Sequence, residues 1–509
     1  MGWLRSTTLH VHQAIGTTPP TLVSAERPSS YYVPVMPGPM VVEYCIPEGI
    51  YSFQTAISLT VLCMIFLSCL VWWLASIPQT SDSDSQTIAA REVARPLLRG
   101  RLRRLDALEG LRTLLVMYVL IYHVRWALPV FLKPYFYWGH WAVQFFFVLS
   151  GFVAAYAHEF SADGPIDFSF EKTRVLVIRR LTRLCPAYFA ALLGLAVIVA
   201  LRGGGEPFLA WPVQALLLQS LMPMTVCGPI DTRHWSRNFL PFSANGEGWF
   251  VSAILVASLL FPLLHNMRPR NGCWATLRAL MAVICLRSVP TLVATAGWSP
   301  IDLYTFAPIR VLEFASGMLS AQLYREMPTW ITECGAWDWI FDASLLYAMI
   351  PLWLLGYWQS WATHESMHGD FFLTGIFCVT CMSARGLAEQ SAESCSKALQ
   401  ASFLVRPCEE KERGCECQCG VRSIGGAPLS GILASRLFTA PAAYSYSAYI
   451  FQEIFIASFT LLPLYVRLWW LPITLPWIAA VFSLHFLEEP LKRCVEAWLR
   501  ASRQQVVLK

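Results

Sequence analysis

The chain has 509 residues, of which 56% are hydrophobic and 14% are charged, and its mean hydropathy is +0.48. Soluble proteins carry about 25% charged residues, so this composition excludes an ordinary soluble domain and predicts a polytopic membrane protein. The net charge of +5 is small and is spread along loops, which argues against a nucleic-acid-binding protein.

The first part of the chain contains one long apolar segment between two polar ones. Residues 1–55 are rich in Pro and Ser and lack periodicity, which predicts a disordered extramembrane arm. Residues 56–77 contain no acidic or basic side chain and predict an N-terminal transmembrane anchor. Residues 78–104 form a basic linker that the positive-inside rule places in the cytosol. Its arginines are Arg91, Arg95, Arg99, Arg101, Arg103 and Arg104.

Further apolar segments predict a series of membrane-spanning helices after the anchor. They lie near residues 110–131, 138–158, 187–201, 249–265, 276–297, 304–322, 338–357, 370–387, 443–463 and 468–487. The predicted fold class is therefore all-α, a polytopic membrane helical bundle of about ten core spans plus the anchor. Basic residues fall in every loop that this order returns to the cytosol, provided that Pro207 to Met224 does not cross the membrane. The interior prolines and limited length of this segment predict a re-entrant or interfacial one.

A polar insertion at residues 388–430 interrupts the later spans and is predicted to be cytosolic. It contains a Cys-rich run from Cys408 to Cys419, and three interpretations of this run stay open: a solvated disordered loop, reversible acylation of the thiols, and a zinc site. The Cys-x-Cys spacing and the lack of a neighbouring His disfavour zinc, so no metal is expected. Residues 494–509 are predicted to form a cytosolic tail.

Arg112 and His123 lie on one apolar segment, and no acidic or basic residue stands between them. An ionisable side chain inside a membrane is costly unless a partner, water or substrate offsets its burial, so both are candidate functional residues. Their separation of eleven residues places them on nearly the same helix face, about 16 Å apart along the axis. They therefore line one cavity at two depths, with Arg112 nearer the cytosol.

Small residues interrupt several of the predicted spans. Gly110, Ser150-Gly151 and Gly317 lie within or beside apolar helices. Because small side chains let membrane helices approach closely, we expect these positions at helix crossings and do not expect Ser150 to act as a nucleophile.

Four patterns stand in order along the chain. They are Arg112-x10-His123, the aromatic-rich Val143 to Phe152, the basic Arg179-Arg180-Leu-Thr-Arg183 in a predicted cytosolic loop ahead of a span, and Arg310-Val-Leu-Glu313-Phe. Together they resemble the motifs of the acyltransferase type 3 family of membrane proteins. The resemblance covers a membrane domain at residues 105–493 and leaves out the arm, the anchor and the Cys-rich insertion.

The resemblance implies an O-acyltransferase that moves an acetyl or other short acyl group from acyl-CoA to a hydroxyl. Acetyl-CoA is the expected donor, and the acceptor is a carbohydrate, a lipid or a small molecule. The expected partners are therefore membrane lipid, acyl-CoA and this acceptor, in a multi-pass integral membrane protein.

Site residues follow from the same resemblance and from elementary chemistry. Acyl transfer to a hydroxyl needs a base, and a neutral imidazole is the usual one, so His123 is the catalytic candidate, with Arg112 and Glu313 beside it. Guanidinium groups match the phosphates of acyl-CoA, so the candidate donor-binding residues are Arg179, Arg180, Arg183 and Arg310. Arg310 and Glu313 are three residues apart on a helix, and an internal ion pair is an equally good interpretation of them.

Three positions depart from the family pattern. Gln144 stands where the family usually has Asp, Ile254 where Glu is common, and Gln452 where a His follows the Ser-Tyr-Ser motif. Two other functions therefore stay open. One is a small-anion transporter that uses Arg112 and Arg310 as ligands, and the other is a catalytically inactive membrane scaffold.

Overall fold

The computed structural model describes residues 105–136, 139–159, 170–201, 210–222, 245–269, 272–294, 304–327, 339–347, 373–383, 428–459 and 468–507. Every regular element in these ranges is helical, which confirms the all-α class. The predicted arm, anchor and basic linker, and the run from Cys408 to Cys419, lie outside the described residues.

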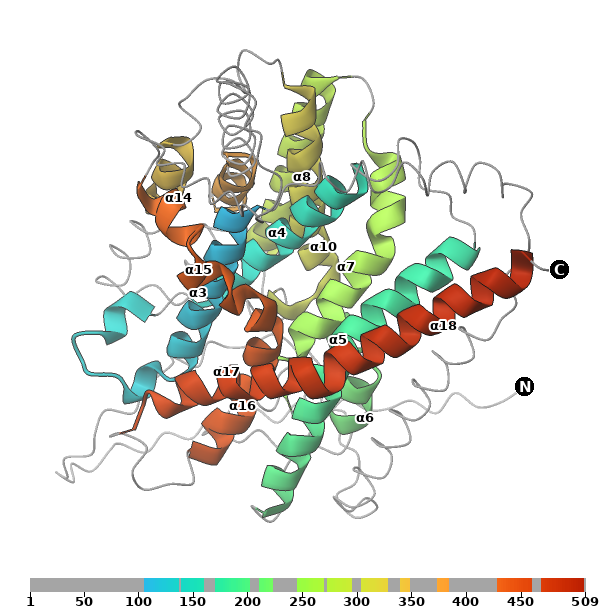
Figure 1. Cartoon of the computed structure of the whole chain (residues 1–509). Helices are drawn as coiled ribbons and strands as arrows, with labels where there is room; N and C mark the ends of the chain where they lie inside the picture. The colour runs from blue at the N-terminus through green and yellow to red at the C-terminus, as the bar shows by residue number, and fades with distance from the viewer. Residues whose placement is uncertain are drawn as a thin grey trace, which may run out of the picture. The chain divides into compact units, whose positions relative to one another are not determined.

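The helices follow one another through the described ranges (Figure 1). The first half contains α3 (Asp106–His123), α4 (Gly139–Glu159), α5 (Phe170–Leu201), α6 (Ala210–Ala215), α7 (Gly248–Met267) and α8 (Cys273–Ala294). The second half contains α10 (Ala307–Glu326), α14 (Pro428–Leu433), α15 (Arg436–Thr439), α16 (Ser445–Phe459), α17 (Leu471–Ser483) and α18 (Glu489–Val507). Short 3-10 turns are η1 (Arg125–Ala127), η2 (Lys133–Phe136), η3 (Gln219–Leu221) and η7 (Pro441–Tyr444), and η8 (Leu484–Glu488) is a π-helical turn.

Three of the described helices are long and apolar enough to cross a membrane. They are Arg174–Leu201, Gly248–Met267 and Leu471–Ala501. Two shorter apolar helices, Trp141–Ala157 and Leu373–Ser383, fall within further predicted spans. Composition and helix length therefore indicate a membrane protein. The larger number of spans stays a prediction.

The close crossing of α4 and α10 depends on glycine. A Cβ added at Gly151 would overlap the carbonyl oxygen of Phe314, and one added at Gly317 would overlap the carbonyl oxygen of Val148. Gly110 on α3 meets the carbonyl of Leu433 in the same way. The predicted role of these glycines in helix packing is confirmed, because any larger residue would push the backbones apart.

The segment from Pro207 to Met224 contains no long helix in its described part, residues 210–222. The six-residue α6 is followed by a turn, in which Leu217 has a φ of 57°, and then by η3. Trp211 and Gln214 on α6 are fully buried. A membrane crossing needs about 20 helical residues, so this geometry agrees with the expectation of a segment that does not span.

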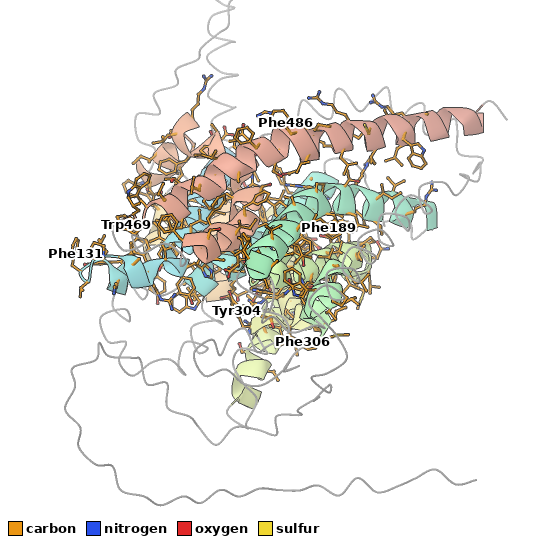
Figure 2. The ribbon with its side chains drawn as sticks, turned by 90° about the horizontal axis from the view of Figure 1, so that it is seen from below. Phe131, Phe189, Tyr304, Phe306, Trp469 and Phe486 are labelled. Atoms are coloured by element: carbon orange, nitrogen blue, oxygen red, sulfur yellow. The ribbon has the colours of Figure 1, made fainter. Side chains whose placement is uncertain are left out.

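The helices α17 and α18 form one long helical rod at the C-terminal end of the described residues. The turn η8 joins α17 to α18 without a break, and the rod passes across α5 (Figure 1). Phe486, in η8, is 71% exposed and stands on the outer side of the rod (Figure 2). Residues 494–507, predicted as a tail, continue this helix to Val507.

Candidate functional site

His123 forms a close ion-pair contact with a carboxylate from a distant part of the chain. Its Nε2 lies 2.9 Å from Oε1 of Glu247, and the side chains are 29% and 6% exposed. His123 is the last residue of α3, and Glu247 is the residue that precedes α7. The negative charge of Glu247 therefore lies at the positive end of the α7 dipole, which is a favourable position. The contact joins the C-terminal end of α3 to the N-terminal end of α7. It pairs a partly exposed imidazole with a buried carboxylate.

Hydrogen bonds within a buried turn hold Glu247 in place. The backbone N–H of Glu247 donates to Oδ1 of Asn245 over 3.1 Å. The backbone N–H of Asn245 in turn donates to Oε1 of Gln214 over 3.0 Å, and the Tyr188 hydroxyl donates to the Gln214 carbonyl over 2.9 Å. Because Asn245 and Gln214 are fully buried, these hydrogen bonds hold the backbone of Glu247 in a fixed position.

Glu313 lies between two arginines and does not contact His123. Its carboxylate accepts hydrogen bonds from Arg310 Nη1, at 2.7 and 2.8 Å, and from Arg287 Nε, at 2.8 Å. All three side chains are at most 5% exposed. Two guanidinium groups share one carboxylate, so this buried cluster carries one net positive charge. The carboxylate in contact with His123 is Glu247, while Glu313 holds Arg310 and Arg287.

Aromatic rings connect the His123–Glu247 pair to the arginine cluster. The guanidinium of Arg310 lies 4.6 Å from the ring centre of Tyr304 and 5.6 Å from that of Trp249. Such contacts stabilise positive charge that is removed from water. Tyr304, labelled in Figure 2, interacts electrostatically with both Arg310 and Glu247. The pair and the cluster are therefore parts of one buried region.

Arg112 lies in the N-terminal half of α3, eleven residues before His123. Its Nη2 donates to the carbonyl oxygen of Ala442, in η7, over 3.2 Å. His123 interacts electrostatically with Glu453 on α16. Ala442 and Glu453 follow one another along the chain in the same order as Arg112 and His123, so α3 and α16 run in the same direction. Arg112 thus contacts the start of the α16 region, and His123 lies near its middle.

Arg179, Arg180 and Arg183 lie inside α5, which begins at Phe170. The prediction of a loop at these residues was wrong, because arginine is a good helix former and a dense basic segment does not require a loop. Arg179 and Arg183 are exposed, and Arg180 is half-buried. Arg183 also interacts electrostatically with Glu488, at the end of η8.

Glu488 is fixed by two serines from different helices. Its Oε1 accepts hydrogen bonds from Ser447 on α16 over 2.5 Å and from Ser483 on α17 over 2.9 Å. The π-helical turn η8 thereby links the C-terminal rod to α16 and places a carboxylate beside the basic part of α5. Turns of this kind occur frequently at functional sites.

The positions that depart from the expected motifs are all buried. Gln144 donates from Nε2 to the hydroxyl of Thr374 over 2.7 Å, and Ile254 is 8% exposed on α7. Gln452 is fully buried on α16. In the parts of the chain that the structure describes, no group of three His, Cys, Asp or Glu side chains is arranged to hold a metal.

Sequence reasoning singled out His123 but missed Glu247. The available signal was a lone acidic residue at the start of an apolar span, two residues before Trp249. Glu247 is seven residues before Ile254, which is about two helical turns and nearly the same face. The carboxylate expected near Ile254 therefore has a counterpart at the end of the same helix.

Comparisons with known proteins gave one match. A family model described as an acyltransferase domain matches residues 105–408, which are 304 of the 509 residues. The matched range contains α3, α4, α5, α7, α8 and α10, and thus both the His123–Glu247 pair and the arginine cluster. No curated protein and no solved structure matches the chain.

Proposed function

We propose that this chain, which belongs to the acyltransferase type 3 family, transfers an acetyl or other short acyl group from acyl-CoA to a hydroxyl. Membership of the family supports a membrane acyltransferase. The donor, the O-acyl product, the multi-pass topology and the acceptor class, whether carbohydrate, lipid or small molecule, belong to the proposal. The proposed chemistry needs no metal.

The contact between His123 Nε2 and Glu247 Oε1 carries the proposal. A carboxylate at Nε2 favours the tautomer with its proton on that nitrogen, which leaves Nδ1 to accept a proton from the acceptor hydroxyl. The hydroxyl oxygen attacks the thioester carbonyl carbon, the carbon–sulfur bond breaks, and the departing CoA thiolate takes the proton from Nδ1. Glu247 stabilises the imidazolium between these two proton transfers.

The arginine cluster supplies positive charge next to this pair. Negative charge develops on the thioester oxygen as the hydroxyl attacks, and a fixed positive group in a buried region stabilises it. We infer that Arg310 and Arg287 provide this field and that Glu313 holds the two guanidinium groups in place. Glu313 then acts through Arg310, and Arg310 acts on the acyl end of the donor.

The basic segment of α5 is the proposed binding site for the phosphates of acyl-CoA. Arg179, Arg180 and Arg183 lie within about one and a half helical turns, and guanidinium groups bind phosphate oxygens through paired N–H donors. We assign Arg112 to the same donor, as a group that binds a phosphate or polarises the thioester carbonyl. Its hydrogen bond to Ala442 fixes it against η7.

Membranes that contain the full chain can be incubated with radiolabelled acetyl-CoA, and label followed into protein, glycan and lipid fractions. We expect the wild-type chain to label a hydroxyl-bearing fraction and His123→Ala to label none while keeping its thermal unfolding transition. Undiminished transfer by His123→Ala would overturn the mechanism. Anion flux without an acylated product would instead support a transporter, and neither flux nor product would support an inactive scaffold.

A further inference from the structure

Gln452 on α16 is fully buried, yet its side chain makes no hydrogen bond in the part of the chain that the structure describes. Both Nε2 and Oε1 lack a partner there. A buried carboxamide is costly when its donor and acceptor are both unsatisfied, so such a group usually faces a ligand or water. Gln452 also lies beyond residues 105–408, the range matched by the family model.

The common direction of α3 and α16 places Gln452 toward the His123 end of this helix pair. Arg112 donates to the Ala442 carbonyl ahead of α16, and His123 interacts electrostatically with Glu453 within α16, so Gln452, the residue before Glu453, lies on the His123 side of this helix pair. Gln452 is therefore on the part of α16 toward the proposed base and away from Arg112.

The face of α16 that carries Gln452 also faces the Glu247 region. Tyr449 precedes Gln452 by three residues, which places the two side chains about 60° apart around the helix. Tyr449 interacts electrostatically with Glu247, and its ring centre lies 5.2 Å from that of Phe250. The Gln452 side chain is thus beside the region that contains the His123–Glu247 pair.

A second carboxamide in this region has an unsatisfied donor. Asn245 uses Oδ1 to accept from the Glu247 backbone, while its fully buried Nδ2 has no acceptor among the described residues. Buried aromatic rings surround the same region, with Trp249 and Tyr304 centred 4.8 Å apart. Neutral polar groups within aromatic walls match a neutral ligand that has both apolar faces and several oxygens.

We propose that Gln452 binds a second oxygen of the acceptor, next to the hydroxyl that becomes acylated, and that the acceptor is therefore polyhydroxylated. This inference rests on the proposed function. A carboxamide offers one acceptor and two donors, and neighbouring hydroxyls complement both at once. A simple alcohol leaves these atoms unpaired, so Gln452 is a specificity residue and takes no part in proton transfer.

The test compares two acceptors of similar size that each carry one primary hydroxyl. Methyl β-glucopyranoside also has neighbouring ring hydroxyls, whereas cyclohexylmethanol has none. The purified full chain in lipid nanodiscs receives radiolabelled acetyl-CoA with either acceptor, and kcat and KM are measured. We expect the wild-type chain to prefer the glucoside by about tenfold or more in kcat/KM, as expected for one or two satisfied hydrogen bonds.

Gln452→Met keeps the length of the side chain and removes the donor and acceptor atoms that would bind the acceptor. It should abolish the preference by raising KM for the glucoside, while KM for acetyl-CoA and turnover of cyclohexylmethanol stay within about twofold of wild type. Gln452→Asn, a second variant that keeps the carboxamide, should retain part of the preference. Ser458→Ala is the matched control, because the Ser458 hydroxyl bonds within α16 to the Ile454 carbonyl, and it should behave as wild type.

Two outcomes would overturn the inference. A higher KM for acetyl-CoA with an unchanged acceptor preference would assign Gln452 to the amide groups of the donor, and no change in either quantity would make it a packing residue. Both outcomes require active enzyme. Failure of the proposed function is recognised separately, because the wild-type chain would then label neither acceptor and release no CoA.

Discussion

Replacing Glu247 with Gln tests the central contact of the site with the smallest change in shape. Glu247 is 6% exposed and its Oε1 lies 2.9 Å from His123 Nε2, so water screens this contact poorly. A hydrogen bond to a charged group contributes about 1.5–3 kcal/mol, and Gln cannot stabilise the imidazolium that forms during transfer. A loss of about 2 kcal/mol corresponds to a fall in kcat of about 30-fold. KM for acetyl-CoA should stay unchanged, because the lost interaction is made in the transition state.

The assay measures release of the CoA thiol together with formation of the labelled ester. Glu453→Gln is the matched control, since Glu453 interacts electrostatically with His123 without the close contact that Glu247 makes. We expect this control to lose less than about fivefold in kcat. The double variant His123→Ala with Glu247→Gln should be no slower than His123→Ala alone, because Glu247 acts through the imidazole. A Glu247→Gln enzyme within about twofold of wild type, or a larger loss in Glu453→Gln, would refute the assignment.

Two further predictions concern the donor site and the helix crossing. Arg180→Ala combined with Arg183→Ala should raise KM for acetyl-CoA by about tenfold or more with little change in kcat, measured by steady-state kinetics over a range of donor concentrations. An effect on kcat alone would contradict the assignment of these residues to the phosphates. Gly151→Ala should destabilise the protein by about 1–3 kcal/mol and lower its Tm in detergent, because the added Cβ overlaps a carbonyl oxygen on α10. Gly375→Ala, where a Cβ meets nothing within 4 Å, should not lower the Tm, and equal losses in both variants would contradict the packing argument.

The sequence was a good guide to helix positions and to close packing, since both depend on local patterns. Apolar segments predicted α4 and α7 to within a few residues, and small residues predicted the crossing at Gly151 and Gly317. The prediction was wrong at Arg179 to Arg183, where positive charge was interpreted as a loop. Charge determines which side of a membrane a segment prefers, and it does not decide whether the segment is helical.

The candidate site was predictable only in part, because its contacts join distant segments. His123 could be singled out from its cost of burial in an apolar helix. Glu247 lies 124 residues further along the chain, and only the packed structure brings its carboxylate to the imidazole. Glu313 was the expected partner of His123 because of its motif, and the motif cannot show that Arg287 also binds Glu313.

The charges of the site explain why Glu247 can serve without a carboxylate at the Ile254 position. Arg287 and Arg310 carry two positive charges, and Glu313 and Glu247 carry two negative ones, so the region is neutral while His123 is neutral. When His123 takes the proton of the acceptor, the new positive charge is matched by the negative charge that develops on the thioester oxygen. The region is then neutral before and during transfer, which avoids the cost of net charge in a low-dielectric interior. A second buried carboxylate would upset this balance at both stages, so the apolar residue on α7 is consistent with an active enzyme.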